Sequence, residues 1–287
     1  MRSRQRRISG VAAAVAVAAL AVFGQSAQAA PDRLKCPSGG TPAPGSTVTG
    51  GVEVDGVCVL TSVTVSGGIV VDETTLEQLL AGGGQNVAAL SGATVSGGIV
   101  VESGSGLTTG IDLDTFTLTH NVSTIDGRVE FRHGGFFIAE ATIRGGIIKD
   151  GAFDWHLFCG DDPFCFGTDF VCRSEVIGNI SVNDVNSEQV FLGDPVDATF
   201  PNGEDCGTNT IHGSILMTNS NFVRFDGEPS EIEGETVTGS VRLDHSTAEV
   251  NGNTIGGSLL CANGTVIHPG PPPDPAGNTV RGTDTCG

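Results

Sequence analysis

The stretch TVSGGIVV occurs at residues 64–71 and again, unchanged, at residues 94–101. Apolar residues recur at every second position of this unit, which predicts a β-strand with one buried face. The glycine in its middle predicts a corner or a close approach of the backbone. Because a short strand cannot bury its apolar face alone, we expect the second copy to stack on the first.

A looser form of this unit, T-[VI]-x-G-x-[VIL]-x-apolar, recurs along the chain. The shortest intervals between copies are 17 and 18 residues, and the longer intervals look like this length plus an insertion. A short unit with variable insertions is typical of a solenoid. The copies begin at Thr47, Thr64, Thr94, Thr124, Thr142, Glu175 (where threonine is missing), Thr210, Thr236, Thr254 and Thr279.

We therefore predict an all-β chain that folds as a single-stranded parallel β-helix (solenoid), right-handed, with a short helical excursion and a Cys/Phe-rich loop excursion. The alternative is an antiparallel sandwich or barrel, for which Asn-Gly pairs would supply hairpin turns. Such pairs occur at residues 202–203, 251–252 and 263–264. Identical strands that recur at one spacing fit parallel stacking better.

The first residues have the features of a secretory signal peptide. A basic head with Arg6 and Arg7 precedes an apolar run from Val11 to Phe23, which is too short to span a bilayer comfortably. Ala27-Gln28-Ala29 supplies the small residues that a signal peptidase reads. We expect residues 1–29 to be cleaved off during export by either the Sec or the twin-arginine route, and the mature protein to be secreted or at the cell surface.

The expected organisation of the mature chain is an N-terminal segment, residues 30–46, followed by a β-helix domain, residues 47–287. The net charge is −19 at pH 7. A surface this acidic repels nucleic acid and anionic membranes. It is compatible with Ca²⁺ or basic partners, but solubility outside the cell is the simpler explanation. Lys35 and Lys149 are the only lysines.

Eight cysteines in an exported chain indicate disulfides, and the chain contains no CxxC zinc or redox motif. Cys261 and Cys286 occupy matching places in the last two repeats, each seven residues after the first residue of its unit (261 − 254 and 286 − 279). In stacked turns such positions lie above one another, so we predict that these two pair. The others are Cys36, Cys58, Cys159, Cys165, Cys172 and Cys206.

The first expected excursion covers residues 72–90. Thr74 and Glu77 have the spacing of a capping box, Gly82 can end the helix, and Leu76, Leu79 and Leu80 form an apolar face. A short helix here would cover a corner of the solenoid or, alternatively, bind a partner through its leucines.

The second expected excursion, residues 153–175, is rich in cysteine and phenylalanine. It is either a small disulfide-stapled core or an exposed surface. In the second case Trp155, Phe158 and Phe164 could stack on a sugar or a partner chain.

Candidate catalytic groups lie in the same excursion. Asp161 and Asp162 could act as a carboxylate pair, and His156 lies close to them in the sequence, where it could also join a metal site. Gly160-Asp161-Asp162 and His212-Gly213 imitate two motifs of the polygalacturonases. The first motif of that family, NTD, is missing upstream, and no lysine follows Lys149 to complete the last motif, RxK.

A lyase-like site would need a calcium cluster and an arginine base. No recognisable calcium-ligand loop is present, and Arg128, Arg132 and Arg144 are expected to be solvated side chains on strands.

The C-terminal region resembles a known protein family. NTIGGSLLCANG (residues 253–264), a Pro/Gly stretch and GNTVRGTDTC (residues 277–286) are similar to the C-terminal signature of secreted bacterial β-helix proteins, GNTVxGNLxCxxN followed by a proline-containing loop and GNTVxG…C. Those proteins are mostly uncharacterised and loosely similar to bactofilin-like and pectin-lyase-like solenoids. The resemblance implies the fold, with residues 254–287 as its C-terminal cap, and it implies no catalytic residue.

The sequence thus predicts a secreted or cell-surface structural or adhesive β-helix protein without catalytic activity, cofactor or metal. A cell-surface glycan or a protein would be its partner. The alternative is an extracellular polysaccharide-active enzyme, pectate-lyase- or glycosidase-like, on the same scaffold. A groove on one solenoid face, lined by convergent Asp, Arg or His, would distinguish the enzyme from the structural protein.

Overall fold

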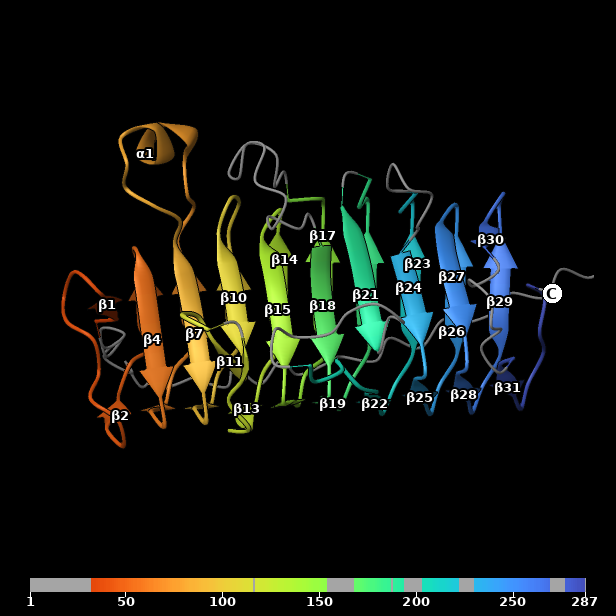
Figure 1. The fold of residues 1–287 in the computed structure, drawn as a ribbon, viewed down its shortest axis with the longest axis horizontal. Coiled ribbons are helices and arrows are strands. Elements are labelled where there is room, and N and C mark those ends of the chain that lie inside the picture. The colour runs from red at the N-terminus through yellow and green to blue at the C-terminus, as the bar shows by residue number, and fades with distance from the viewer. Residues whose placement is uncertain are drawn as a thin grey trace, which may run out of the picture. The chain divides into compact units, whose positions relative to one another are not determined.

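A computed structural model describes residues 32–115, 117–153, 168–186, 188–193, 203–221, 230–268 and 277–286. Its strands form three long parallel sheets, here named A, B and C, and each turn of the chain passes through sheets B, A and C in that order (Figure 1). This arrangement is a parallel β-helix, as the repeats predict. The handedness of the solenoid stays a prediction.

Sheet A contains, in order, β1 (Leu34–Cys36), β3 (Val52–Val54), β6 (Ile69–Val71), β9 (Ile99–Val101), β14 (Val129–Arg132), β17 (Ile147–Asp150), β20 (Ile180–Asn183), β23 (Ile215–Thr218), β26 (Val241–Asp244) and β29 (Leu259–Ala262). Sheet B contains β2 (Thr47–Val48), β5 (Thr64–Val65), β8 (Thr94–Val95), β13 (Ser123–Ile125), β16 (Ala141–Ile143), β19 (Glu175–Val176), β22 (Thr210–Ile211), β25 (Thr236–Val237), β28 (Thr254–Ile255) and β31 (Thr279–Val280). Sheet C contains β4 (Val57–Thr61), β7 (Val87–Ser91), β10 (Gly106–Thr109), β15 (Gly135–Ala139), β18 (Thr168–Cys172), β21 (Gln189–Gly193), β24 (Ser230–Glu233), β27 (Thr247–Asn251) and β30 (Val266–His268).

The two identical copies lie directly on one another. Thr64 pairs with Thr94 between β5 and β8, and Ile69 pairs with Ile99 between β6 and β9. In each copy the alternate apolar residues point inward and are almost fully buried. Like side chains therefore stack about 4.8 Å apart along the interior, which is how repetition gives each strand a buried partner.

The glycine in the middle of each unit marks the corner between sheets B and A. A Cβ atom added to Gly97 would lie 2.7 Å from the backbone nitrogen of Gly68 in the preceding turn, and one added to Gly67 would lie 2.7 Å from that of Gly51. These neighbours are main-chain atoms, which cannot move aside as a side chain could. The corner glycines are thus explained by close backbone approach, as the sequence predicts.

The first excursion contains α1 (Leu76–Leu80), but its cap differs from the prediction. Thr75, not Thr74, is the N-cap, and Gln78, not Glu77, completes the capping box. Thr74 is buried, and its hydroxyl accepts a hydrogen bond from the backbone N–H of Asn86 at 2.8 Å. Because this bond closes the base of the excursion, the helix can begin only one residue later.

Two other boundaries also differ. The strand β1 extends sheet A into the segment that precedes Thr47. Residues 168–172, which the sequence placed in the second excursion, form β18.

Antiparallel pairing among the described strands is confined to β11 (Ile111–Asp112) and β12 (Thr117–Leu118). The turn at Asn263-Gly264 joins strands of different sheets and does not form a hairpin.

Three disulfides join the described cysteines. Cys36 pairs with Cys58, Cys172 with Cys206, and Cys261 with Cys286, the pair that the stacked repeats predict. Cys159 and Cys165 lie outside the described residues. The disulfides indicate an extracellular environment. In the part of the chain that the structure describes, no helix is long and apolar enough to cross a membrane.

Candidate functional site

The residues that the sequence singled out for chemistry lie outside the described residues. These are the candidate catalytic residues Asp161, Asp162 and His156 and the candidate stacking residues Trp155, Phe158 and Phe164. Their roles stay predictions. Within the described ranges, no group of three or more His, Cys, Asp and Glu side chains is placed to hold a metal ion.

A groove of about 470 Å³ runs over the outer face of sheet A, beside its corner with sheet B. Outward-facing side chains of sheet A form one part of the lining, and corner residues form the other. The lining residues include Arg128, Gly145, Ile148, Asn179, Ser181, Ser214, Leu216, Ser240, Arg242 and Leu260.

The sheet register places five of the lining residues in one row. Ile148 pairs with Ser181, Ser181 with Leu216, Leu216 with Arg242, and Arg242 with Leu260, so the five residues form one row on consecutive strands. At about 4.8 Å per strand, the row extends for roughly 19 Å. The row alternates aliphatic and polar side chains, which suits an extended ligand with both kinds of surface.

The charge of the groove contrasts with that of the whole chain. Its lining includes two arginines and three serines but no aspartate, glutamate or histidine. Arg242 pairs with Asp244 at 3.1 Å, whereas Arg128 is exposed and forms no ion pair within the described part of the chain. Arg132 and Arg144, by contrast, form ion pairs with Glu102 at 2.9 Å and with Asp126 at 2.5 Å. Among the described residues, the lining of the groove offers no carboxylate or histidine for acid–base chemistry.

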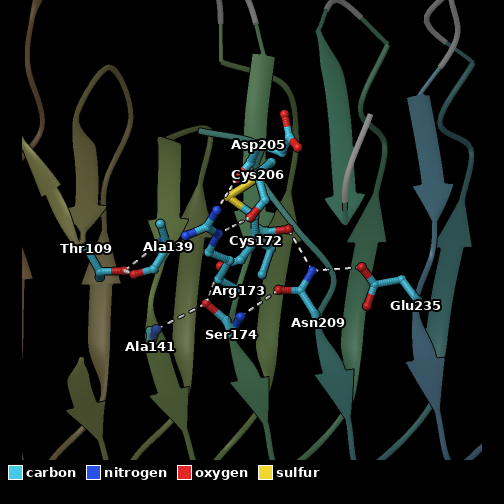
Figure 2. The surroundings of a disulfide bond; sticks show 11 residues. Thr109, Ala139, Ala141, Cys172, Arg173, Ser174, Asp205, Cys206, Asn209 and Glu235 are labelled. Atoms are coloured by element: carbon cyan, nitrogen blue, oxygen red, sulfur yellow. Dashed lines mark hydrogen bonds between the residues drawn. A yellow bond between two sulfur atoms is a disulfide. The ribbon is translucent and has the colours of Figure 1, made fainter. Parts of the chain in front are cut away.

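A second feature is a buried column of polar side chains at the corner between sheets C and B (Figure 2). Asn209 donates to the carbonyl of Val171 at 2.7 Å and accepts from the N–H of Ser174 at 2.9 Å. Asn253 and Asn278 make the equivalent bonds two and three turns further on. Each asparagine thereby satisfies backbone groups that a corner would otherwise leave unpaired inside the protein.

Glu235 occupies the asparagine position of one turn. Its Oε1 accepts from the side-chain nitrogen of Asn209 at 2.8 Å, and Gly193 leaves room for its carboxyl group. Burial raises the pKa of Glu235 to about 8, although the hydrogen bonds from Asn209 act in the opposite direction. The recurrent Asn-Thr-[VI] at residues 209–211, 253–255 and 278–280 is a sequence signal for this column.

A third feature, a buried cluster of Lys149, Asp169 and Glu188, was also missed from the sequence. Lys149 lies seven residues after Thr142, where the other described turns place residues such as Val71, Val101 and Leu243 inward. Aligning the repeats therefore shows one lysine at an inward position that the other turns fill with apolar residues, and this is the sequence signal for the cluster.

No protein-family model matches the chain, and searches of curated proteins and of solved structures gave no match.

Proposed function

We propose that the protein is a secreted or cell-surface structural and adhesive β-helix protein, without catalytic activity, that binds an acidic glycan along the groove over sheet A. The observation that carries this proposal is the composition of the groove. Its lining combines two arginines, serine hydroxyls and aliphatic side chains, with no carboxylate among them.

Charge complementarity favours an anionic ligand. A chain with a net charge of −19 repels polyanions over most of its surface, so a basic groove attracts them locally. The guanidinium of Arg128, which forms no ion pair among the described residues, can form two parallel hydrogen bonds with a carboxylate. The aliphatic side chains of Ile148 and Leu216 offer apolar surface for the faces of sugar rings.

Location and family membership are part of the same proposal. The three described disulfides support an oxidising compartment, and the features of residues 1–29 support export across a membrane. The C-terminal repeats support a place among the secreted bacterial β-helix proteins whose signature they resemble.

A glycan array with the mature protein tests the binding. We expect retention of uronate-containing or otherwise anionic glycans, lost in an Arg128→Ala/Arg242→Ala variant and weakened by salt. Arg132→Ala is the matched control, because Arg132 is an exposed arginine of sheet A that does not line the groove. Equal loss in the control, or preference for neutral glycans, would count against the groove as the binding site.

The enzyme alternative is tested with the same samples. Incubation of the mature protein with polygalacturonate, with and without Ca²⁺, should release neither reducing ends nor unsaturated uronates. Release that disappears in an Asp161→Asn/Asp162→Asn variant would replace the adhesive proposal with a polysaccharide-active enzyme.

A further inference from the structure

The interior of the solenoid contains a cluster of three charged residues, Lys149, Asp169 and Glu188, whose side chains are completely buried. Lys149 extends inward from β17 of sheet A, and Asp169 extends inward from β18 of sheet C, so the two meet across the core. The Nζ atom of Lys149 lies 2.8 Å from Oδ2 of Asp169 and also contacts Oε1 of Glu188. Both positions belong to inward columns that neighbouring turns fill mainly with apolar residues.

The surroundings of this cluster are apolar and aromatic. The ring of Phe136 lies 5.8 Å from the Nζ atom of Lys149 and packs against the ring of Phe131. Phe153, also buried, donates its backbone N–H to Glu188. Two carboxyl groups and one amine in such an environment are balanced in charge only when one carboxyl is protonated.

The pKa directions agree with this requirement. Burial raises the pKa of Asp169 and, by a larger margin, that of Glu188, where the negative charge of Asp169 adds to the effect. Burial lowers the pKa of Lys149, but the two carboxylates outweigh burial, so its pKa lies above the ordinary value. One of the two carboxyl groups therefore carries a proton, and transfer of a second proton from Lys149 to the other carboxylate leaves a neutral amine beside two neutral acids.

We propose that Lys149 and Asp169 form an intramolecular isopeptide bond, with Glu188 as the proton carrier. The lone pair of Nζ attacks Cγ of Asp169, and a C–N bond forms. Glu188 donates its proton to the hydroxyl oxygen of Asp169, whose bond to Cγ breaks, and takes a proton from the nitrogen in return. One molecule of water leaves, the product is a neutral amide, and Glu188 ends protonated as it began. No oxidant, reductant or activating group is consumed.

The geometry explains why Asp169 is the acceptor. Its Oδ1 accepts the backbone N–H of Phe136 at 2.6 Å, which polarises the carboxyl group towards attack and stabilises the developing negative charge. The position of β18 between β15 and β21 fixes Asp169, while the carbonyl of Gly134 accepts from Lys149 at 2.5 Å and fixes the amine. Groups held in contact react with effective molarities that can reach on the order of 10⁵ M, and the apolar core favours the departure of water.

The bond would close a loop of 169 − 149 = 20 residues between β17, which ends at Asp150, and β18, which begins at Thr168. It would therefore join sheets A and C at the base of the second excursion. Such a link acts like a disulfide in limiting the unfolded chain, but reduction does not break it.

Intact mass of the full-length mature protein after reduction is the primary test. We expect a mass one water below that of the sequence, and a tryptic digest with one branched peptide that contains Lys149 joined to Asp169 and no cleavage after Lys149. A full mass together with a linear Lys149 peptide would overturn the proposal. A branch at Glu188 would overturn the assignment of Asp169 as acceptor.

Variants separate this bond from other losses of water, such as succinimide formation at an aspartate. Lys149→Arg keeps the positive charge but removes the nucleophile, so we expect the full mass; a water still missing would refute the bond. Glu188→Gln should also give the full mass, and complete cross-linking in this variant would refute the proton-carrier role. Lys35→Arg is the control, because Lys35 forms an exposed pair with Glu53 at 2.6 Å and should leave the mass deficit unchanged.

Discussion

Asn209 donates a hydrogen bond from its side-chain nitrogen to Oε1 of Glu235 at 2.8 Å, and the two residues occupy the same corner position in consecutive turns (Figure 2). Asparagine fits this position because its amide both donates and accepts. A carboxylate only accepts, so Glu235 donates only when it carries a proton. Its other oxygen, Oε2, is buried without a hydrogen-bond partner within the described part of the chain.

This pair predicts a pH-dependent stability. With its pKa raised to about 8, Glu235 is protonated in the folded protein but ionised in the unfolded chain from about pH 4.5 upwards. Unfolding then releases a proton, so the free energy of unfolding falls as the pH rises from about 4.5 to about 8. At pH 7 the loss is about 3 kcal/mol, at roughly 1.4 kcal/mol per pH unit.

Urea unfolding across this pH range checks the effect in a Glu235→Gln variant, which keeps the shape but does not titrate. The variant should be more stable than the wild type by about 3 kcal/mol at pH 7, with the difference disappearing below about pH 4.5. Glu73→Gln, at an exposed position, should follow the wild type at every pH. A constant difference between Glu235→Gln and the wild type would show that packing, not titration, causes it.

The corner glycines predict a steric effect. The Cβ of a Gly97→Ala variant would meet three backbone atoms of Gly67 and Gly68 at 2.7–2.9 Å. The stacked turns cannot separate without loss of their ladder hydrogen bonds, so we expect a destabilisation of about 2 kcal/mol in urea unfolding. Gly277→Ala is the control, since nothing lies within 4 Å of its added Cβ, and it should change stability by less than about 0.5 kcal/mol. Equal effects of the two variants would exclude close turn-to-turn packing.

The parts of this fold that repeat could be predicted from the sequence. Identical strands imply a shared register, and the central glycine implies a corner. Both predictions succeed because the same contacts between neighbouring turns recur at every repeat. Single departures from the repeat could not be placed so easily. Thr74 competes with Thr75 for the helix cap, and a bond to Asn86 that is distant in sequence decides the outcome. The partners of Lys149 lie 20 and 39 residues further on (169 − 149 and 188 − 149), across insertions whose length hides the register.

Export makes a separate prediction. If residues 1–29 are a signal peptide, protein isolated from an oxidising compartment should begin at Ala30. All eight cysteines should resist thiol titration without reductant, because their number is even and three pairs already join the described cysteines. N-terminal sequencing and thiol titration check both statements. An N-terminus at Met1, or two free thiols, would contradict export through a cleaved signal.

The last prediction concerns the two ends of the solenoid, where most of the terminal strands pair with a described strand on one side only. The Cys261–Cys286 disulfide closes a separation of 25 residues and joins positions whose Cα atoms lie 5.0 Å apart, pinning β31 and the end of the chain to β29. Cys36–Cys58 does the same for β1 at the other end. Since each turn is stabilised mainly by its neighbours, removing one disulfide should loosen only the adjacent turns.

A Cys261→Ser/Cys286→Ser variant should lose up to about 3 kcal/mol of its free energy of unfolding. Hydrogen exchange should accelerate at β29 and β31 while β5–β9 stay protected. The Cys36→Ser/Cys58→Ser variant is the mirror control and should loosen β1 and β4 instead. Uniform acceleration along the chain in either variant would mean that the solenoid unfolds as one cooperative unit, and that its end disulfides act on the whole protein rather than as local caps.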